Sequence, residues 1–158
     1  MKALSPEQLL KLWQKMSVHS LGKKAFSKIL GQVIPYTGSI SPLIEEWETG
    51  RCHVSIKDSR KVRNHLNCIH AIALANLGEL STGLAVTSIL PEGGKIILKN
   101  LEIEYIKKAK GPIYAIAESG VLPSELGSEN IEHKVSSKIF DQNKIHVCSA
   151  HAVWVVRK

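Results

Sequence analysis

Apolar residues recur at helical spacing over the first 34 residues, which predicts two amphipathic helices. Ser5, Pro6 and Glu7 mark the start of the first, because serine caps a helix, proline fits its first position and glutamate suits its positive end. The second runs from about Leu21 to Ile34 and has lysines among its polar positions. We expect both helices to pack against the rest of the chain, although basic amphipathic helices also dock on membranes or partners.

Residues 68–90, CIHAIALANLGELSTGLAVTSIL, carry one formal charge, at Glu79. The length of this run would permit a membrane span. Polar residues gather at its middle, however, and strand-like segments follow it. We therefore expect a helix that is apolar on nearly all sides and is buried by the rest of the protein.

Alternating apolar and polar residues predict strands on both sides of this helix. Two short strands, 43–47 and 52–56, follow a turn region at 35–42. From Lys95 onward the period is two, and further strands are expected at 113–121, 131–140 and 145–156, with a loop over 122–130. One apolar helix followed by antiparallel strands predicts an α+β fold whose sheet wraps around the helix. We expect a helical extension over residues 1–34 and one domain over residues 35–158.

The composition narrows the class of protein. The 158 residues suit one globular domain, and the 44% hydrophobic content excludes a mostly disordered, collagen-like or coiled-coil chain. Three cysteines without a CxxC pair argue against a disulfide framework and a zinc ribbon, and suit a reducing cytosol. Charges interrupt every apolar run near the N-terminus, so we expect no signal peptide and a cytoplasmic location. The net charge of +7 favours an anionic partner: nucleic acid, a membrane surface or a phosphorylated small molecule.

Glu79 is the strongest candidate for chemistry. Burial raises the pKa of an unpaired carboxylate, which suits a general base or a nucleophile. A glutamate that bonds to a buried polar partner, or one that faces a gap filled with solvent, would have no catalytic role. Its helix face also carries Ile72, Asn76 and several small residues, which leave room for a ligand. His70, nine residues earlier, falls on the opposite face, about 13 Å away along the helix. A site that uses both positions must lie between two subunits.

The segment from Arg63 to Ala71, at the start of this helix, holds further polar candidates. Free backbone N–H groups at a helix N-terminus polarise a carbonyl or hold an oxyanion, and the Asn64 amide would add to them. Asn67 is expected to cap the helix. A later basic cluster either holds a phosphate or forms an ordinary solvated turn: Lys107, Lys108 and Lys110.

Metal and nucleic-acid signatures are missing from the sequence. No set of histidines, cysteines and carboxylates has metal-ligand spacing. We also find no aromatic stacking pair on a strand, no zinc finger and no helix-turn-helix. We therefore expect no metal, no nucleic-acid partner and no stable membrane insertion.

This pattern of elements resembles the hotdog fold, and more narrowly the DUF4442 group within the thioesterase-like hotdog superfamily. The resemblance covers about residues 34–156 and is carried by Arg63-Asn64-His65, His70-Ala71, Asn76 to Leu80, and Ile103 to Gly111. In related small acyl-CoA thioesterases, an asparagine lies six residues before the histidine of a His-Gly-Gly motif, and an acidic residue lies nine after it. Asn64, His70 and Glu79 keep both spacings.

The resemblance implies an acyl-thioester hydrolase that works as a homodimer or a dimer of dimers. Its substrate would be an acyl group on coenzyme A or acyl carrier protein, with no other cofactor. Glu79 would act as base or nucleophile, Asn64 would orient the reacting group, and the N–H of Ala71 after His70 would polarise the thioester carbonyl across the dimer interface. The basic cluster at residues 107–110 would meet the phosphates of coenzyme A. Beyond the resemblance, we expect further substrate contacts from Asn67, Ile72 and Asn76.

Two positions depart from the pattern of those thioesterases. The His-Gly-Gly motif has become His70-Ala71-Ile72, which adds bulk where the thioester would approach. Leu98 stands where some relatives have an assisting serine or threonine. These departures motivate an alternative function, a non-catalytic hotdog module that binds acyl thioesters or lipids.

Overall fold

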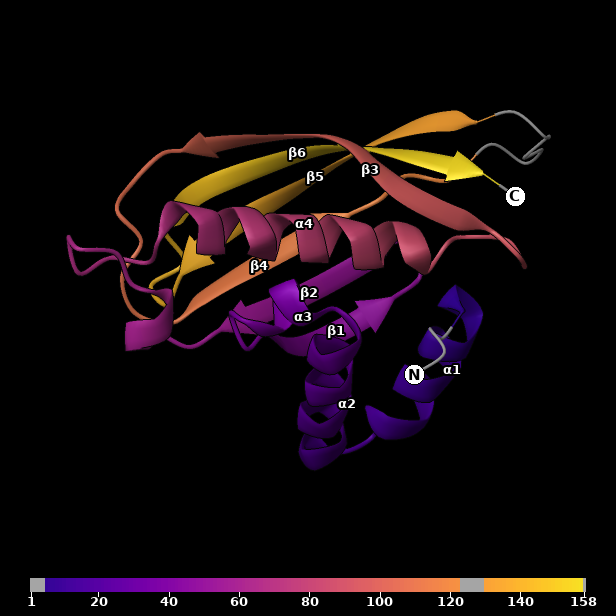
Figure 1. The fold of residues 1–158 in the computed structure, drawn as a ribbon, viewed down its shortest axis with the longest axis horizontal. Coiled ribbons are helices and arrows are strands. Elements are labelled where there is room, and N and C mark those ends of the chain that lie inside the picture. Colours follow the sequence, from indigo (N-terminus) through magenta and orange to yellow (C-terminus); the bar gives the residue numbers. More distant parts are fainter. Residues whose placement is uncertain (1–4, 123–129, 158) are drawn as a thin grey trace.

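A six-stranded antiparallel sheet curves around one long helix, α4, in the computed structural model of the chain, which describes residues 5–122 and 130–157 (Figure 1). The strand order is β1-β2-β4-β5-β6-β3. The strands are β1 (Leu43–Glu48), β2 (Arg51–Ile56), β3 (Lys95–Tyr105), β4 (Ile113–Glu118), β5 (Ile131–Asp141) and β6 (His146–Arg157). The predicted α+β arrangement is confirmed, although most of the loop expected over 122–130 lies outside the described residues.

Helix α4 (Ala71–Thr87) is the apolar helix expected from the sequence, and it packs on β2, β4, β5 and β6. Its buried face carries Leu74, Leu77, Leu80 and Leu84, as expected for the core. The helix begins later than predicted, because Ile69 pairs with Arg63 in a β-bridge and His70 has an extended backbone with ψ 139°. Among the described residues, no helix combines the length and apolarity needed to cross a membrane.

Small residues let α4 approach the sheet closely. A Cβ added to Gly78 would lie 2.4 Å from the Cβ of Ala150 on β6. Beside this contact, Ser81 Oγ donates a hydrogen bond of 2.8 Å to Ser137 Oγ of β5, and Trp154 Nε1 of β6 donates to Thr82 Oγ1 at 3.2 Å. These buried bonds fix the position of α4 along the sheet and, with it, the position of Glu79.

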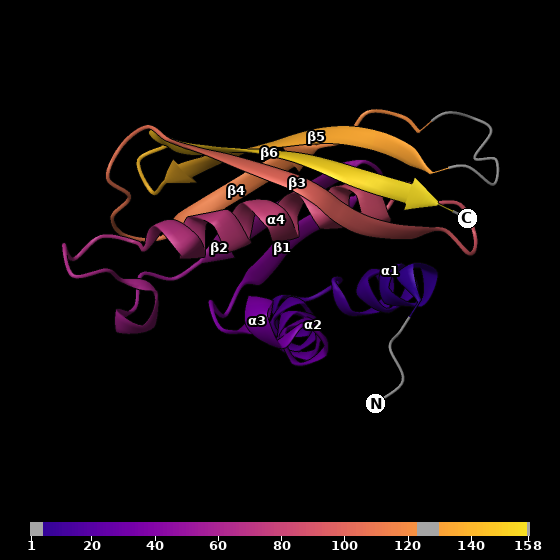
Figure 2. The ribbon, with the colours of Figure 1, turned by 45° about the horizontal axis from the view of Figure 1, so that its top comes forward.

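Helices α1 (Pro6–Met16) and α2 (Ser20–Val33) pack on the side of α4 away from most of the sheet (Figure 2). Trp13 and Phe26 are buried and meet Trp47 of β1 in an aromatic cluster, and Trp47 Nε1 donates to Leu84 O at 2.7 Å. The prediction that both helices pack against the chain is thus confirmed. The region expected to be a turn, 35–42, instead starts with the one-turn helix α3 (Pro35–Gly38), since proline suits a first helical position.

The outer face of the sheet contradicts one sequence-based expectation. Tyr114 on β4 and Phe140 on β5 are directly paired and stack, with ring centroids 5.4 Å apart and planes at 23°. His53 and His146 extend this row of rings across β2 and β6. The statement that no aromatic pair stacks on the strands was therefore wrong, because the two rings are brought together by strand register and not by proximity in the sequence.

Candidate functional site

Glu79 lies on the only stripe of α4 that the sheet leaves partly open among the described residues, together with Ile72, Ala75 and Gly83. Its side chain is half-buried, and no described residue hydrogen-bonds or ion-pairs with its carboxylate. Burial raises the pKa of Glu79 above the usual value of 4.5, and no cation among the described residues counteracts this shift. A carboxylate in this condition binds protons more readily than an ordinary surface glutamate, as the sequence predicts.

The first turn of α4 is held by two side chains. His70 is the N-cap residue, and its Nδ1 accepts a hydrogen bond of 3.1 Å from the Ile72 N–H. Tyr105, at the end of β3, donates from its hydroxyl to Ala71 O at 3.0 Å. No described residue accepts a hydrogen bond from the Ala71 N–H, which is the first N–H of the helix. The Ala71 N–H is therefore available to a ligand, whereas the His70 imidazole caps the helix.

Asn64 shapes the loop that leads into α4. Its Oδ1 accepts hydrogen bonds from the N–H groups of Leu66 at 3.0 Å and Cys68 at 3.1 Å. Asn67, in contrast, is exposed, and its Oδ1 accepts from Arg63. The expectation that Asn67 caps the helix was wrong, because α4 starts four residues later and His70 is its cap.

The basic turn of residues 107–110 lies against this same loop. Ala109 is buried, and its carbonyl accepts a hydrogen bond of 2.9 Å from the Ile69 N–H. Asp58 strengthens the arrangement, because it accepts from both the Gly111 N–H and the Arg63 side chain. The exposed side chains that flank Ala109 are thereby placed next to the entrance of α4: Lys107, Lys108 and Lys110.

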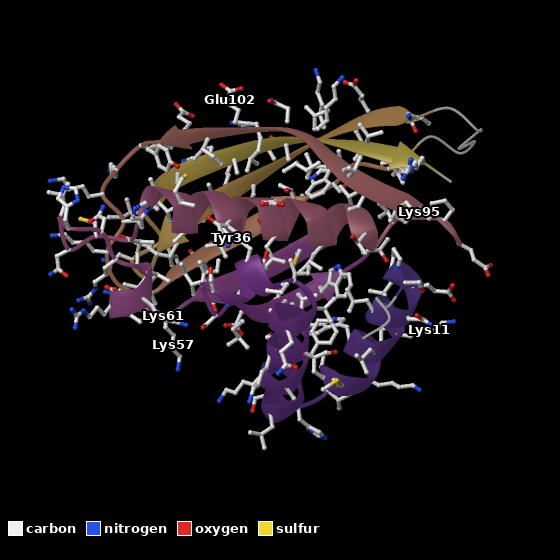
Figure 3. All side chains as sticks on the ribbon, viewed as in Figure 1. Lys11, Tyr36, Lys57, Lys61, Lys95 and Glu102 are labelled. Carbon is white, nitrogen blue, oxygen red and sulfur yellow. The ribbon has the colours of Figure 1, made fainter. Side chains whose placement is uncertain are left out.

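Asn76 does not share the open surface of Glu79. It is 4% exposed, and its Nδ2 donates a hydrogen bond of 3.2 Å to the backbone oxygen of Tyr36 in α3. Figure 3 shows Tyr36 just below α4, on the side of the N-terminal helices. Sequence reasoning missed both Tyr36 and Tyr105, because each is more than 30 residues from its partner on α4.

Comparison with known proteins identifies the family. Residues 22–156 match the family described as a domain of unknown function, DUF4442. The chain belongs to the DUF4442 family. No curated protein matches the sequence of this DUF4442 chain.

Solved structures show the fold of the DUF4442 protein. It is 29% identical to genomics APC5556, with a TM-score of 0.78 over 96% of this chain and 97% of that one. A Pseudomonas aeruginosa protein of unknown function, described as a probable thioesterase, is 20% identical, with a TM-score of 0.70 over 90% and 97% of the two chains. A mutant of the Staphylococcus aureus thioesterase SAV0944 is 17% identical, with a TM-score of 0.69 over 78% and 99%. The DUF4442 protein thus has the hotdog fold, and the fold resemblance is confirmed.

The candidate residues of the DUF4442 protein form two groups. Asn64, His70, Ala71 and the basic turn gather at the N-terminal end of α4. Glu79 lies eight residues beyond Ala71, about 12 Å farther along the helix. No three His, Cys, Asp or Glu side chains converge as metal ligands in the described part of the chain. One chain therefore presents the Glu79 carboxylate and the unpaired Ala71 N–H at separate places.

Proposed function

We propose that this protein hydrolyses an acyl thioester, with acyl-coenzyme A as the substrate class. The observation that carries the proposal is the half-buried Glu79 carboxylate, which has no partner among the described residues. In this position it takes a proton from an attacking water or attacks the thioester carbonyl itself. The Ala71 N–H of α4 polarises the carbonyl oxygen and stabilises the negative charge that develops on it.

The two groups act together in a homodimer. They are about 12 Å apart along one helix, so the Glu79 that meets a given Ala71 N–H belongs to the other subunit. The two edges of the sheet support this arrangement. At β1 the edge is covered by α2, because Ser27 Oγ accepts from the Ile44 N–H and Lys23 Nζ donates to Glu45 O.

The opposite edge, β3, is long and uncovered by any described residue. It has 11 residues, pairs with β6 alone, and exposes Ile97 and Tyr105 by 62% and 49%. An exposed strand edge with apolar side chains favours pairing with another chain. Pairing here would bring a second subunit next to α4, because Tyr105 already contacts Ala71.

The basic turn supports coenzyme A as the carrier. Lys107, Lys108 and Lys110 are exposed beside the entrance of α4, where the thioester carbonyl would bind. Their charges attract the phosphates of coenzyme A while the acyl end reaches the Ala71 N–H. Acyl carrier protein, with its single phosphate linker, remains the other carrier to compare.

A second candidate is a module that binds acyl thioesters without hydrolysing them. Ile72 favours it, because this bulky side chain is 52% exposed in the first turn of α4, next to the proposed carbonyl site. The two candidates differ in turnover. The binding module requires micromolar binding of acyl-coenzyme A with no release of free thiol.

The test is hydrolysis of a panel of acyl-coenzyme A substrates by wild type and by Glu79→Gln. Removing a general base lowers kcat by about 10²- to 10⁴-fold. Glu48→Gln is the matched control, since Glu48 is an exposed glutamate at the end of β1, on the edge of the sheet opposite β3. Glu79→Gln with the wild-type rate would refute the mechanism. No turnover by the wild type, together with calorimetric binding, would establish the binding module.

A mixing experiment tests the shared site. Ala71→Pro removes the proposed N–H, yet proline fits this first helical position and His70 already has the extended ψ of 139° that precedes proline. Each single variant is expected to be inactive. Mixed after unfolding and refolding together, Glu79→Gln and Ala71→Pro form heterodimers with one intact site, which restores about a quarter of wild-type activity. Absence of restoration in proven heterodimers would place both groups in one chain.

A further inference from the structure

Positive charge gathers on the N-terminal helices without any carboxylate among it. Between residues 8 and 44 the sequence has no aspartate or glutamate and five lysines: Lys11, Lys15, Lys23, Lys24 and Lys28. Lys24 and Lys28 belong to α2, are exposed, and form no ion pair with a described residue. A group of cations that the chain does not neutralise favours an anionic partner.

One face of α2 is left uncovered by the described part of the chain. Its buried residues, Phe26, Ser27 and Leu30, pack toward the sheet. Exposed residues recur every three or four positions along the opposite face: Leu21, Lys24, Ala25, Lys28 and Gln32. Leu21 is 76% exposed, and Val18, just before the helix, is 70% exposed. Figure 1 shows α2 extending away from the sheet with its first residues at the far end, where a flat partner can reach them.

A hollow of about 380 Å³ lies beside this face, between α2, α3 and the start of β1. Lys57, which follows β2, lines it together with Lys24 and Lys28, and no carboxylate is among its lining residues. The carboxylates of β1 line a different hollow, between α1 and β1. Lysines are common ligands of phosphate groups, so three of them around one hollow fit a phosphate.

We infer that α2 and the loop before it dock on a membrane surface that carries anionic phospholipids. Val18 and Leu21 enter the boundary between the headgroups and the acyl chains, and the hollow lined by the three lysines receives a lipid phosphate. The helix lies on the membrane and does not span it. Nucleic acid fits less well, because its bases stack on aromatic rings and the exposed face of α2 has none. The inference does not depend on the proposed thioesterase activity.

The test is co-sedimentation of the full chain with two kinds of vesicle, phosphatidylcholine alone and phosphatidylcholine mixed with phosphatidylglycerol. The measured quantity is the partition coefficient, which should be high for the mixed vesicles and should fall as salt is added. Each lysine next to an anionic bilayer raises the partition coefficient by about fivefold. A variant with three substitutions should therefore bind roughly a hundredfold more weakly: Lys24→Gln, Lys28→Gln and Lys57→Gln.

A second triple variant is the matched control, because it loses the same net charge from exposed lysines of β5 and of the turn after it: Lys134→Gln, Lys138→Gln and Lys144→Gln. Strand β5 lies on the far side of α4 from α2 (Figure 1). Charges farther from the bilayer than about 10 Å are largely screened by salt. The control should therefore bind nearly as tightly as wild type.

Leu21→Ser tests the apolar part of the contact. Loss of this side chain should lower the partition coefficient by roughly tenfold, because a buried leucine then no longer contributes. Val121→Ser is the matched control, since Val121 is 93% exposed and follows β4, away from α2. It should bind like wild type. The four substituted positions of α2, β2 and β4 are exposed or partly so, and the folds of these variants are checked by circular dichroism.

A fluorescent label reports which surface meets the membrane. The native cysteines are buried, so an environment-sensitive fluorophore reacts with the introduced thiol of Leu21→Cys. Its emission should shift to shorter wavelength with the mixed vesicles, whereas the same label on Val121→Cys should not respond.

Several results would overturn the inference. They are no binding of wild type to the mixed vesicles, an equal loss of binding in the two triple variants, and no spectral shift of the label on Leu21→Cys. Tighter binding to a single-stranded oligonucleotide than to the vesicles would assign the lysines to nucleic acid instead. An oligomer that forms without vesicles and that Leu21→Ser dissociates would assign the face to a second copy of this chain.

Discussion

Gly78→Ala tests whether the close approach of α4 to the sheet holds the fold together. The added Cβ would lie 2.4 Å from the Cβ of Ala150, whereas carbon atoms in contact settle at about 3.5–4.0 Å. Helix α4 and strand β6 must therefore separate locally by more than about 1 Å. Neither residue has a flexible side chain that could turn aside, and both belong to hydrogen-bonded elements.

The magnitude follows from two opposing effects. Replacing glycine by alanine within a helix stabilises the helix by about 1 kcal/mol. Forcing a methyl group into a packed core costs about 1–3 kcal/mol, and the short contact at Gly78 favours the upper end. We expect a net destabilisation of about 1–2 kcal/mol. Gly83→Ala is the comparison, because its added Cβ meets ring atoms of Trp154 at 3.0 Å, a longer contact than the 2.4 Å at Gly78. It should lose less stability than Gly78→Ala.

Urea unfolding followed by circular dichroism measures both variants, with a constant m-value as the check that the transition is comparable. Ala150→Gly in the Gly78→Ala background removes the opposing methyl group. The double variant should therefore be more stable than the sum of the single effects predicts. The argument that this contact sets the distance between α4 and the sheet would be refuted if Gly78→Ala were as stable as wild type. It would also be refuted if the effects of Gly78→Ala and Ala150→Gly on the free energy of unfolding were additive.

Two further predictions concern the candidate site. Burial raises the pKa of Glu79, so the carboxyl group binds its proton more tightly in the folded protein than in the unfolded chain. The stability of the fold therefore decreases as the pH rises from about 4.5 through the folded-state pKa. Glu79→Gln should gain stability relative to wild type between about pH 4 and pH 7, measured by urea unfolding, and a difference independent of pH would contradict this. Asn64→Ala should lose about 1–2 kcal/mol, because the N–H groups of Leu66 and Cys68 lose their acceptor, while Asn64→Asp keeps it. Equal thermal stability of the Ala and Asp variants would show that these bonds do not hold the loop.

The order of elements was predictable because each depends on neighbours in the sequence. Alternation from Lys95 onward predicts the later strands, and the apolar run predicts α4. The start of α4 was misplaced because hydropathy continues through Cys68 and Ile69, which are buried outside the helix. Ile69 instead pairs with Arg63 in a β-bridge, and the local sequence carries no signal for this pairing.

The site was predictable only in part, for a similar reason. Glu79 stands out as the lone charge of an apolar run, and its unpaired, half-buried state agrees with that interpretation. The partner of Asn76 is 40 residues away in α3, and the role of Asn64 depends on a tight loop. Such pairings are decided by tertiary packing, and spacing along the chain does not encode them.

The apolar content of α4 bears on the proposed dimer. The sequence predicts a helix buried on nearly all sides, and the chain buries the faces of Leu77 and Leu84 completely or nearly so. It leaves Ile72 52% exposed and the stripe through Glu79 and Gly83 partly open. Burying apolar surface is favourable, so a helix more apolar than its own chain can cover favours a second protein surface on that stripe. That surface would exclude water around Glu79 and raise the pKa of its carboxyl further, which would strengthen it as a base at neutral pH.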